Sequence, residues 1–464
     1  MSRAHDIVAQ LSEEDLTSFV LGQRWFGAKS REVAHVKVID STVAREDAPA
    51  LALALVEIRF HPGTHETYHV PIGLRPAESG WSEGRIAQID DQVLYDATAD
   101  PELAQELAAL MREQRTLEAP DGAVLEFRTV SGAEDELGDL EEVRPMGVEQ
   151  SNTSLVFDDR LVLKLYRRLE PGINPELELL RFLTEQGFPN IAALEGWAQY
   201  LGKPMDSTLA VLQHFVPSEG DGWKLALDSL AGESEPFLGR LRRLGEVTGA
   251  MHTVLASDAS DPSFCSEEPS SEALALLVAT VDEEIEQLFL ALPDDPALEP
   301  IAGRGEEVRE RLRLRSRVGA TGRVIRHHGD YHLGQVLWAE EDWVVIDFEG
   351  EPARGLIERR RKRSPLRDVA GMLRSFAYAA SASTLERGVE PIEGWEDRAR
   401  SEFVAGYLEE VDSGIVPSGE AFDRLLALFE LEKAVYELRY ELDNRPDWVR
   451  IPVAGIARLL EAGP

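Results

Sequence analysis

The residues best suited to chemistry lie in one short segment, His327-His328-Gly329-Asp330-Tyr331-His332-Leu333-Gly334-Gln335. Asp347 follows Gln335 after twelve residues and is itself followed by Phe348 and Glu349. Phosphoryl transfer requires a carboxylate that orients and deprotonates the acceptor hydroxyl, and oxygen ligands that hold Mg²⁺ across the β- and γ-phosphates. Asp330 suits the first role as catalytic base, and Gln335 and Asp347 suit the second as metal ligands. The order and spacing of these three residues therefore predict phosphoryl transfer from ATP.

A second set of residues, far upstream, could hold the nucleotide. Lys164 stands near the end of a predicted strand, where its ammonium could reach the α- and β-phosphates. Glu178, fourteen residues later in a predicted helix, could orient that ammonium through an ion pair. The small polar residues that precede the strand could offer backbone N–H groups and hydroxyls to phosphate oxygens: Ser151, Asn152, Thr153 and Ser154. The run VLQHFV is the predicted hinge strand, with adenine-binding backbone groups between Gln213 and Val216.

The histidines of the 327–335 segment allow another interpretation. His328 and His332 are four residues apart, as in a zinc-binding helix. Gly329 and the strand-like residues on either side do not favour the helix that this zinc motif requires. We therefore interpret the segment as a phosphoryl-transfer loop and do not expect zinc.

The elements that must position these residues divide the chain into a strand-rich half and a helical half. Two strand-like runs flank residues 61–64, and a strand–turn–strand covers 154–166 with Asp158-Asp159 as its turn. Amphipathic helices are predicted over 101–117 and 175–187, followed by mostly helical sequence interrupted by a strand-like stretch at 335–350. This pattern predicts a two-lobed α+β protein. We expect domains at 1–88, 89–216 and 217–464.

Composition narrows the function classes. The 464 residues contain 48 Lys plus Arg against 85 Asp plus Glu, a net charge of −37, which disfavours binding to nucleic acid. No run is long and apolar enough to span a membrane, and the first twenty residues lack the apolar core of a signal peptide. The single cysteine, Cys265, cannot form an internal disulfide. These features predict a cytoplasmic enzyme or binding protein that acts on small molecules.

Several segments together resemble the bacterial maltokinases, which belong to the aminoglycoside-phosphotransferase-like branch of the kinase fold. The resemblance covers nearly the whole chain and is carried by QRWFGAK, EQSNTSLVFDDRLVLKLYRRLEPGINPELE, HHGDYHLGQVLW, DFEGEPARGLIERRRKRSPLRDVAGMLRSFAYAA and EKAVYELRYELDNRPDWVRIPVAGI. It implies a bilobal protein-kinase-like α+β fold with an N-terminal cap subdomain. It also implies ATP-dependent phosphorylation of maltose at its anomeric hydroxyl, which would supply maltose 1-phosphate for α-glucan synthesis, with ATP and Mg²⁺ as cofactors.

The resemblance further implies a sugar pocket lined by the helical half. Lys433, Tyr436, Glu437 and Tyr440 fall at i, i+3, i+4 and i+7, on one face of a helix. Aromatic rings flanked by charged groups suit a sugar, although ordinary packing of the helix would place tyrosines in the same way. Glu349 and Arg354, which follow the metal ligand Asp347, are further candidates for the pocket.

Two alternatives to a maltokinase stay open on sequence alone. An amino-sugar or aminoglycoside kinase belongs to the same class, and a chain rich in carboxylates could bind a cationic sugar. A protein of another class, a non-catalytic partner of a trehalose synthase that binds sugar or nucleotide, would not need Asp330, Asp347 and Lys164 together. Some maltokinases are fused to trehalose synthase, so we also consider that enzyme as a partner.

Overall fold

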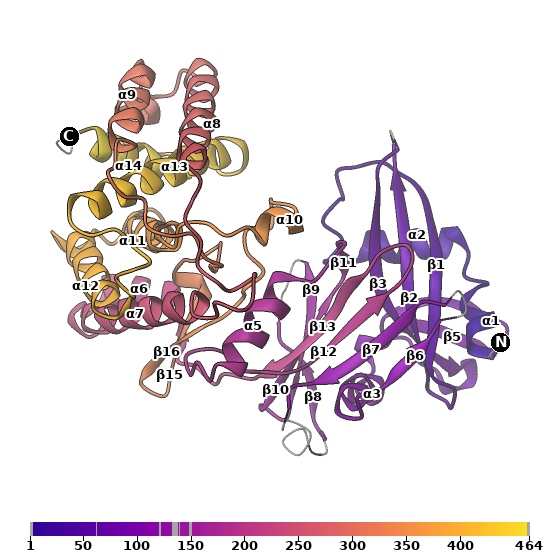
Figure 1. Cartoon of the computed structure of the whole chain (residues 1–464). Coiled ribbons are helices and arrows are strands. Elements are labelled where there is room, and N and C mark those ends of the chain that lie inside the picture. Colours follow the sequence, from indigo (N-terminus) through magenta and orange to yellow (C-terminus); the bar gives the residue numbers. More distant parts are fainter. Residues whose placement is uncertain are drawn as a thin grey trace. The chain divides into compact units, whose positions relative to one another are not determined.

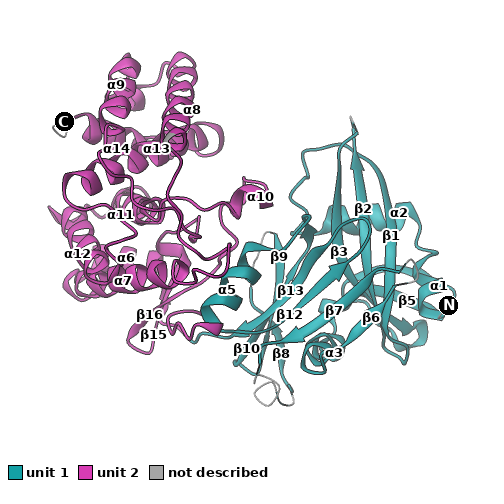
Figure 2. Ribbon diagram, in the orientation of Figure 1, with its two compact units in different colours: residues 1–184, 192–217 teal, residues 185–191, 218–464 magenta. Residues whose placement is uncertain are grey.

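The computed structural model describes residues 3–61, 63–119, 122–131, 138, 140–147 and 151–461. The chain divides into two compact units, residues 1–184 with 192–217 and residues 185–191 with 218–464 (Figure 1, Figure 2). Strands dominate the first unit and helices the second, which confirms the predicted α+β class. The finer division at 88 and 216 stays a prediction.

A six-stranded antiparallel sheet forms the N-terminal part of the first unit. Its strands run in the order β1-β2-β3-β5-β4, and the short β11 pairs with β3. The two runs predicted on either side of residues 61–64 are β2 and β3, paired from Ala50↔Leu74 to Arg59↔His65. The strands are β1 (Val33–Arg45), β2 (Ala50–Phe60), β3 (His65–Pro76), β4 (Arg85–Ile89), β5 (Gln92–Asp96) and β11 (Arg168–Leu169).

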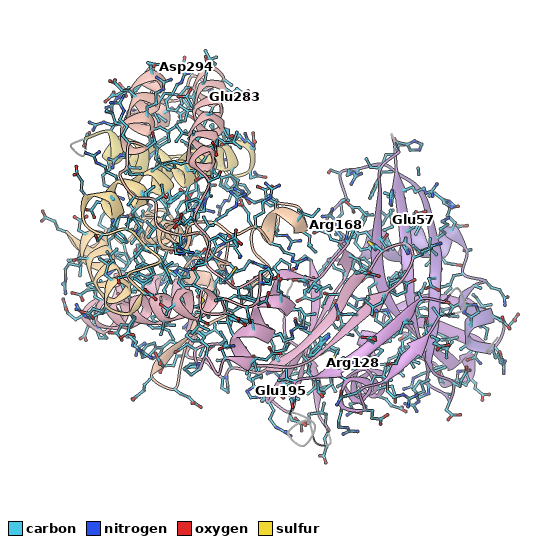
Figure 3. All side chains as sticks on the ribbon, in the orientation of Figure 1. Glu57, Arg128, Arg168, Glu195, Glu283 and Asp294 are labelled. Atoms are coloured by element: carbon cyan, nitrogen blue, oxygen red, sulfur yellow. The ribbon has the colours of Figure 1, made fainter. Side chains whose placement is uncertain are left out.

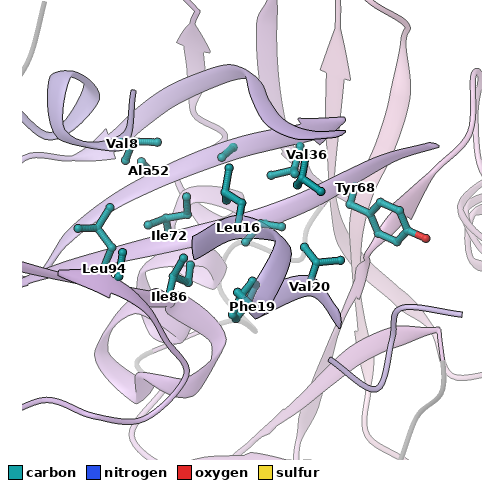
Figure 4. Packing of buried hydrophobic residues seen from close by; sticks show 14 of the residues in the cluster. Val8, Leu16, Phe19, Val20, Val36, Ala52, Tyr68, Ile72, Ile86 and Leu94 are labelled. Carbon is teal, nitrogen blue, oxygen red and sulfur yellow. The ribbon is translucent and has the colours of Figure 1, made fainter. Parts of the chain in front are cut away.

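Two short helices, α1 (Arg3–Val8) and α2 (Glu13–Gly22), contribute to the apolar core against this sheet. Val8, Leu16 and Phe19 of the helices belong to one buried cluster with sheet residues such as Ala52 and Ile72 (Figure 4). Trp25 and Phe26 of the QRWFGAK segment are buried in the same cluster, and each ring lies against that of Tyr68. This segment therefore builds the core of the N-terminal sheet.

A seven-stranded antiparallel sheet makes up the rest of the first unit, in the order β6-β7-β12-β13-β10-β9-β8. The predicted strand–turn–strand is β9 and β10, and both turn residues, Asp158 and Asp159, have positive φ, as tight hairpins require. The strands are β6 (Thr116–Glu118), β7 (Val124–Thr129), β8 (Val143–Pro145), β9 (Asn152–Phe157), β10 (Leu161–Tyr166), β12 (Leu194–Leu201) and β13 (Ser207–His214).

The two helices attached to this sheet compare differently with the prediction. The predicted helix at 175–187 is α5 (Pro175–Glu185). The helix predicted over 101–117 is shorter, because α3 (Pro101–Arg112) ends before Gln114, whose φ is +49°. Thr116 and Leu117 belong instead to β6, which pairs with β7. Pairing at the sheet edge has overridden the helical pattern at these positions.

The second unit consists mostly of helices around α11, which is buried along most of its length. A three-stranded sheet, in the order β14-β15-β16, accompanies them. The strands of this sheet are β14 (Gly220–Asp221), β15 (Val336–Ala339) and β16 (Asp342–Val345). The helices of the second unit are α6 (Gly222–Ala231), α7 (Glu235–Leu255), α8 (Ser271–Leu290), α9 (Gly305–Arg315), α10 (Leu356–Arg359), α11 (Leu366–Arg387), α12 (Trp395–Glu410), α13 (Glu420–Asn444) and α14 (Arg450–Glu461).

The helical unit carries charge on its exterior. Glu283 on α8 and Asp294 beyond its end are both exposed (Figure 3). Across the part of the chain that the structure describes, no helix combines the length and apolar character that crossing a bilayer demands.

Candidate active site

The loop that carries Asp330 is held through its backbone. Asp368, near the start of α11, accepts hydrogen bonds from the backbone N–H groups of His328 (2.8 Å) and Gly329 (2.9 Å). Gly329 has a φ of +86°, a conformation that glycine adopts without strain. Asp330 follows directly, with its side chain 22% exposed. The buried carboxylate thus fixes the backbone immediately before the predicted base.

Asp368 is itself part of a buried polar group. Its Oδ2 lies 3.1 Å from His252 Nε2, and His252 Nδ1 lies 3.1 Å from the Tyr407 hydroxyl. Burial alone would raise the pKa of Asp368, but neighbouring His327 and the hydrogen bond from His252 lower it, so its pKa lies well below the ordinary value. The anionic form is the one that can accept both backbone N–H groups.

The two predicted metal ligands lie next to each other. Gln335 closes a short 3₁₀ turn (Leu333–Gln335) before the β15–β16 hairpin, and Asp347 follows the hairpin. Gln335 Nε2 is 3.1 Å from Asp347 Oδ2, and the Ile346 backbone N–H donates to the Gln335 carbonyl (3.0 Å). Asp347 has a φ of +63°, which turns the chain sharply at this carboxylate. The hairpin therefore brings together an amide and a carboxylate that are twelve residues apart.

The contacts of His328 argue against the zinc interpretation. Its Nδ1 accepts a hydrogen bond from the Asp330 backbone N–H (3.3 Å), so Nε2 carries the proton and donates to the Ile346 carbonyl (2.9 Å). The ring also packs on Phe348, with centroids 4.9 Å apart. Both nitrogens of His328 thus act within the fold and fasten the Asp330 loop to the segment that carries Asp347.

The predicted sugar-binding face on α13 does not form one continuous surface. Glu437 is buried and paired with Arg374 of α11 at 2.7 Å, whereas Tyr440 is 45% exposed, with its ring 5.5 Å from the Arg445 guanidinium. Lys433 Nζ lies 5.0 Å from the ring centroid of Tyr436, so of the four predicted residues these two lie beside each other. The i, i+3, i+4 and i+7 spacing was correct for the helix but did not reveal that α11 covers part of this face.

Glu351, a carboxylate that the sequence prediction missed, connects Lys433 and Tyr436 to the segment that follows Asp347. Glu351 Oε2 accepts from Arg354 Nε at 2.7 Å and lies beside Tyr436. Burial would raise the pKa of Glu351, but Lys433, Tyr436 and Arg354 hold it below the ordinary value, and burial with the Glu351 charge raises the pKa of Tyr436. The only sequence signal for Glu351 was its position four residues after Asp347.

Glu349 and Arg354 have separate environments. Glu349 is half-buried, and its backbone carbonyl accepts from Arg359 Nη1 at 3.0 Å. Arg354 contacts Glu351 and also Glu358, at 2.8 Å. Of the two residues, Arg354 is therefore the one that the structure joins to the Lys433–Tyr436 pair.

In the first unit, Lys164 is buried in the middle of the seven-stranded sheet. It stands on β10 opposite Ser154 of β9 and Val211 of β13. Its Nζ is 2.8 Å from Glu176 Oε2, and the Tyr166 hydroxyl donates to the same oxygen at 2.6 Å. An ammonium held in this way presents a fixed positive charge, as nucleotide phosphates require.

A carboxylate that the sequence prediction did not single out contacts Lys164. Glu176, 1% exposed, precedes the predicted partner Glu178 by two residues in the first turn of α5. Its backbone N–H donates to Asn174 Oδ1 (2.8 Å), which fixes the start of the helix. Glu178 is also buried, and its role toward Lys164 stays a prediction.

The polar residues before Lys164 lie partly within the sheet. Asn152, Thr153 and Ser154 are the first residues of β9, paired with Tyr166, Leu165 and Lys164. Thr153 Oγ1 accepts from Arg167 Nε at 2.8 Å, Ser154 is buried, and Ser151 is exposed just ahead of the strand. The expected tip is therefore shorter than predicted. Gln213, near the end of β13, and Val216, just beyond it, are half-buried and stay candidates for adenine.

Comparison with known proteins assigns the chain to a family. The profile of the family described as "Phosphotransferase enzyme family" matches residues 142–400, more than half of the chain, and that of the "Maltokinase N-terminal cap domain" matches residues 19–100. The chain belongs to the phosphotransferase enzyme family and carries the cap of maltokinases at its N-terminus. The resemblance inferred from sequence and the kinase-like fold with a cap are both confirmed.

Individual relatives agree with this assignment. The glucosamine kinase of Streptacidiphilus jiangxiensis is 27% identical over 370 residues, covering 76% of this chain and 80% of that protein. The glucosamine kinase of Mycolicibacterium smegmatis is 25% identical over 335 residues, covering 69% and 80%. A solved structure of glucosamine kinase with glucosamine, ADP and inorganic phosphate is similar in fold, with a TM-score of 0.73, 20% identity and 98% of each chain covered.

Proposed function

We propose that this phosphotransferase is an ATP-dependent sugar kinase that phosphorylates maltose at its anomeric hydroxyl, giving maltose 1-phosphate and ADP. The observation that carries the proposal is the construction of the Asp330 loop. Its backbone is fixed by Asp368, and His328 fastens it to the segment that carries Asp347. A base and a metal ligand held in this way meet the demand for positioning that dominates phosphoryl transfer.

In the proposed reaction, the oxygen of the sugar hydroxyl forms a bond to the γ-phosphorus while the bond from that phosphorus to the β-phosphate oxygen breaks. Asp330 orients the hydroxyl and accepts its proton, and ADP leaves. Lys164, fixed by Glu176, binds the phosphates of ATP through its ammonium. The ADP bound to the glucosamine kinase of similar fold supports an adenine nucleotide as the donor.

The residues present fit Mg²⁺. Magnesium prefers hard oxygen ligands, and the carboxylate of Asp347 supplies one. The Gln335 amide now donates its N–H to that carboxylate, and a flip of the amide would turn its carbonyl oxygen to the same side as a second ligand. These two side chains would hold the ion, and when bound it would neutralise charge on the β- and γ-phosphates. Gln335 offers the same kind of carbonyl oxygen as the asparagine usual in kinases, on a side chain longer by one methylene.

Charges near Asp330 support a neutral acceptor. The carboxylates on the acceptor side already face cations, because Glu351 contacts Arg354 and Glu437 contacts Arg374. Lys433 adds a positive charge close to Tyr436. The ammonium of an amino sugar would meet Lys433 here, whereas the hydroxyls of maltose can bond with Lys433 and with the Glu351–Arg354 pair. Tyr436 and the exposed Tyr440 could stack on the sugar.

An amino-sugar kinase is the second candidate. It is favoured by the two curated relatives, both named glucosamine kinase and both at least 25% identical over two thirds of this chain. The N-terminal cap is named for maltokinases, and the glucosamine kinase of similar fold also aligns over 98% of both chains, so the cap is compatible with either acceptor. A supply of maltose 1-phosphate to α-glucan synthesis, an association with trehalose synthase and a cytoplasmic location would accompany the first candidate.

The test is a screen of acceptors with the purified full chain and Mg·ATP. Maltose, glucosamine and glucose are compared by ADP release, and the product is identified by the coupling of its phosphorus to the anomeric proton in ³¹P NMR. We expect turnover with maltose, a phosphate on the anomeric carbon, and a KM for maltose that changes little with salt. Turnover of glucosamine alone, with a KM that rises steeply with salt, would replace maltose by the amino sugar. No transfer to any acceptor would reject a sugar kinase.

A further inference from the structure

A single residue separates the strand that carries Lys164 from the six-stranded sheet. β10 ends at Tyr166 and β11 begins at Arg168, so only Arg167 stands between them. β10 belongs to the seven-stranded sheet, whereas β11 pairs with β3 of the six-stranded sheet through Arg168↔Tyr68 and Leu169↔Thr67. The chain therefore passes from one sheet into the other within four residues of Lys164.

The side chain of Arg167 bonds to both sheets. Its Nη2 donates to Asp96 Oδ2 (2.8 Å) and Thr98 Oγ1 (2.9 Å), at the end of β5 and just beyond it. Its Nε donates to Thr153 Oγ1 of β9 (2.8 Å). Its guanidinium carbon lies 5.2 Å from the ring centroid of Trp25. One side chain thus joins the core of the six-stranded sheet to the polar segment 151–154.

Burial makes this arrangement specific for arginine. Arg167 is 1% exposed, and a buried charge is costly unless it is paired and hydrogen-bonded. The guanidinium offers several donors in a fixed planar fork, so it can bond to Asp96 and Thr153 at once and still lie over an aromatic ring. The ammonium of a lysine could pair with Asp96 but has no such fork. We therefore infer a requirement for the shape of arginine as well as for its charge.

The backbone on either side of Arg167 is fixed as well. The His69 N–H of β3 donates to the Arg167 carbonyl at 2.7 Å. Lys164 lies three residues before this point, and its contact Glu176 lies nine residues after it. The segment between the two members of the ion pair is therefore attached to the six-stranded sheet along its path.

We propose that Arg167 is a positioning residue through which the six-stranded sheet sets the affinity for nucleotide. By holding Thr153 and the end of β10, it fixes the polar segment 151–154 opposite Lys164. The proposal rests on the proposed role of these residues in binding ATP. It assigns a function to the N-terminal part of the chain, including Trp25, namely to brace the phosphate side of the nucleotide site.

The test compares Arg167→Met with a matched control, Arg75→Met. Arg75 also pairs with a buried carboxylate, Asp100 (2.8 Å), and also lies over a tryptophan, Trp81 at 4.9 Å, but its side-chain contacts lie within 75–102. KM for ATP, KM for the acceptor, kcat, binding of ADP and the thermal midpoint are measured for both variants. Substitution of a residue that serves stability alone would lower the thermal midpoint but would not change KM for ATP relative to KM for the acceptor.

For Arg167→Met we expect KM for ATP and Kd for ADP to rise about tenfold while KM for the acceptor changes less than about twofold, a split that indicates lost ground-state binding of nucleotide. Arg75→Met should lower the thermal midpoint and leave both KM values within about twofold, since it touches no group that binds substrate. Equal changes in the two KM values of Arg167→Met, or none, would overturn the proposal.

Two milder variants keep the test decisive if Arg167→Met does not fold. Arg167→Lys should retain the pair with Asp96 and most of the thermal stability, yet still raise KM for ATP. Thr153→Val should raise KM for ATP by itself. It should add nothing in the Arg167→Lys background, because both substitutions remove the same hydrogen bond, from Arg167 Nε to Thr153 Oγ1. A normal KM for ATP in both would overturn the proposal. Lys164→Ala separates the two levels, because normal nucleotide binding in that variant would refute the proposed role of Lys164 in binding ATP, on which the inference rests.

Discussion

The two units hold their charged groups in different ways. In the first unit, Lys164 is a buried cation fixed by another side chain, the Glu176 carboxylate, which also accepts from Tyr166. In the second unit, Asp330 and Asp347 are partly exposed anions whose places are set through the backbone. Asp368 holds the N–H groups that precede Asp330, and a positive φ turns the chain at Asp347. At the predicted site, the first unit thus holds Lys164 by a side-chain ion pair, whereas the second unit holds Asp330 and Asp347 mainly through the main chain, with one side-chain contact from Gln335 to Asp347.

This difference suits the two tasks that we propose. A cation that binds phosphates works as a point charge, so a carboxylate partner can orient it and keep it ionised. A carboxylate that accepts a proton or holds a metal needs its oxygens for the reaction, so its position is better fixed through neighbouring peptide groups. Changes in the first unit should therefore affect mainly nucleotide affinity, and changes around the loop of the second unit should affect mainly turnover.

The largest effects should follow from the two carboxylates of the second unit. Asp330→Asn removes the base and should lower kcat by about 10²–10⁴-fold, the range for loss of a general base, with ATP binding retained. Asp347→Asn removes the charge that would anchor Mg²⁺ and should abolish turnover at ordinary Mg²⁺ concentrations. Steady-state kinetics with a magnesium titration separates the two. A near-native kcat in either variant would show that its residue has been given the wrong role.

Asp368→Asn tests the support behind Asp330. The amide can accept only through its oxygen, so one of the two buried N–H groups would lose its acceptor, at a cost of about 1–3 kcal/mol. We expect kcat to fall by about 10–100-fold through misplacement of the base, with KM for ATP nearly unchanged.

Asp282→Asn serves as the control for Asp368→Asn. This carboxylate of α8 pairs with Arg309 at 2.7 Å and with Arg313 at 2.9 Å, away from the loop. It should lose some stability and keep kcat. An equal loss of kcat in the two variants would mean that Asp368 acts only through stability.

The sequence predicted the elements with local signatures. The hairpin around Asp158-Asp159, helix α5 and the β15–β16 hairpin were all recognisable from turn residues and apolar periodicity. Asp330, Gln335 and Asp347 were predicted from their order and spacing, and the interval between Gln335 and Asp347 reflects the hairpin that separates them. The end of α3 was wrong, since the pairing of Thr116 and Leu117 with β7 comes from the rest of the sheet.

The residues that position the site carry no comparable signal. Asp368 lies 38 residues after Asp330, and Arg167 bonds to Asp96 across 71 residues. Glu351 bonds to the nearby Arg354 and also lies beside Tyr436 of α13. In the sequence, none of these charged residues can be distinguished from other charged residues, because their partners are set by the fold. Glu176 is a different case, because it lies only two residues before Glu178, the partner that the sequence predicted for Lys164. The helix itself was predicted correctly, and Glu176 in its first turn contacts Lys164, while the role of Glu178 toward Lys164 stays a prediction.

The smallest and most precise effect concerns this choice between two carboxylates. Glu176→Gln keeps the shape of the side chain but removes the charge that contacts Lys164. A hydrogen bond to a charged group contributes about 1.5–3 kcal/mol, so KM for ATP should rise by about tenfold or more while KM for the acceptor stays constant. Glu178→Gln, in the same turn and equally isosteric, is the matched control and should change KM for ATP less than about threefold if Glu176 is the main partner. The reverse order of the two effects would return the role to Glu178 and would show that the contact of Lys164 changes when nucleotide binds.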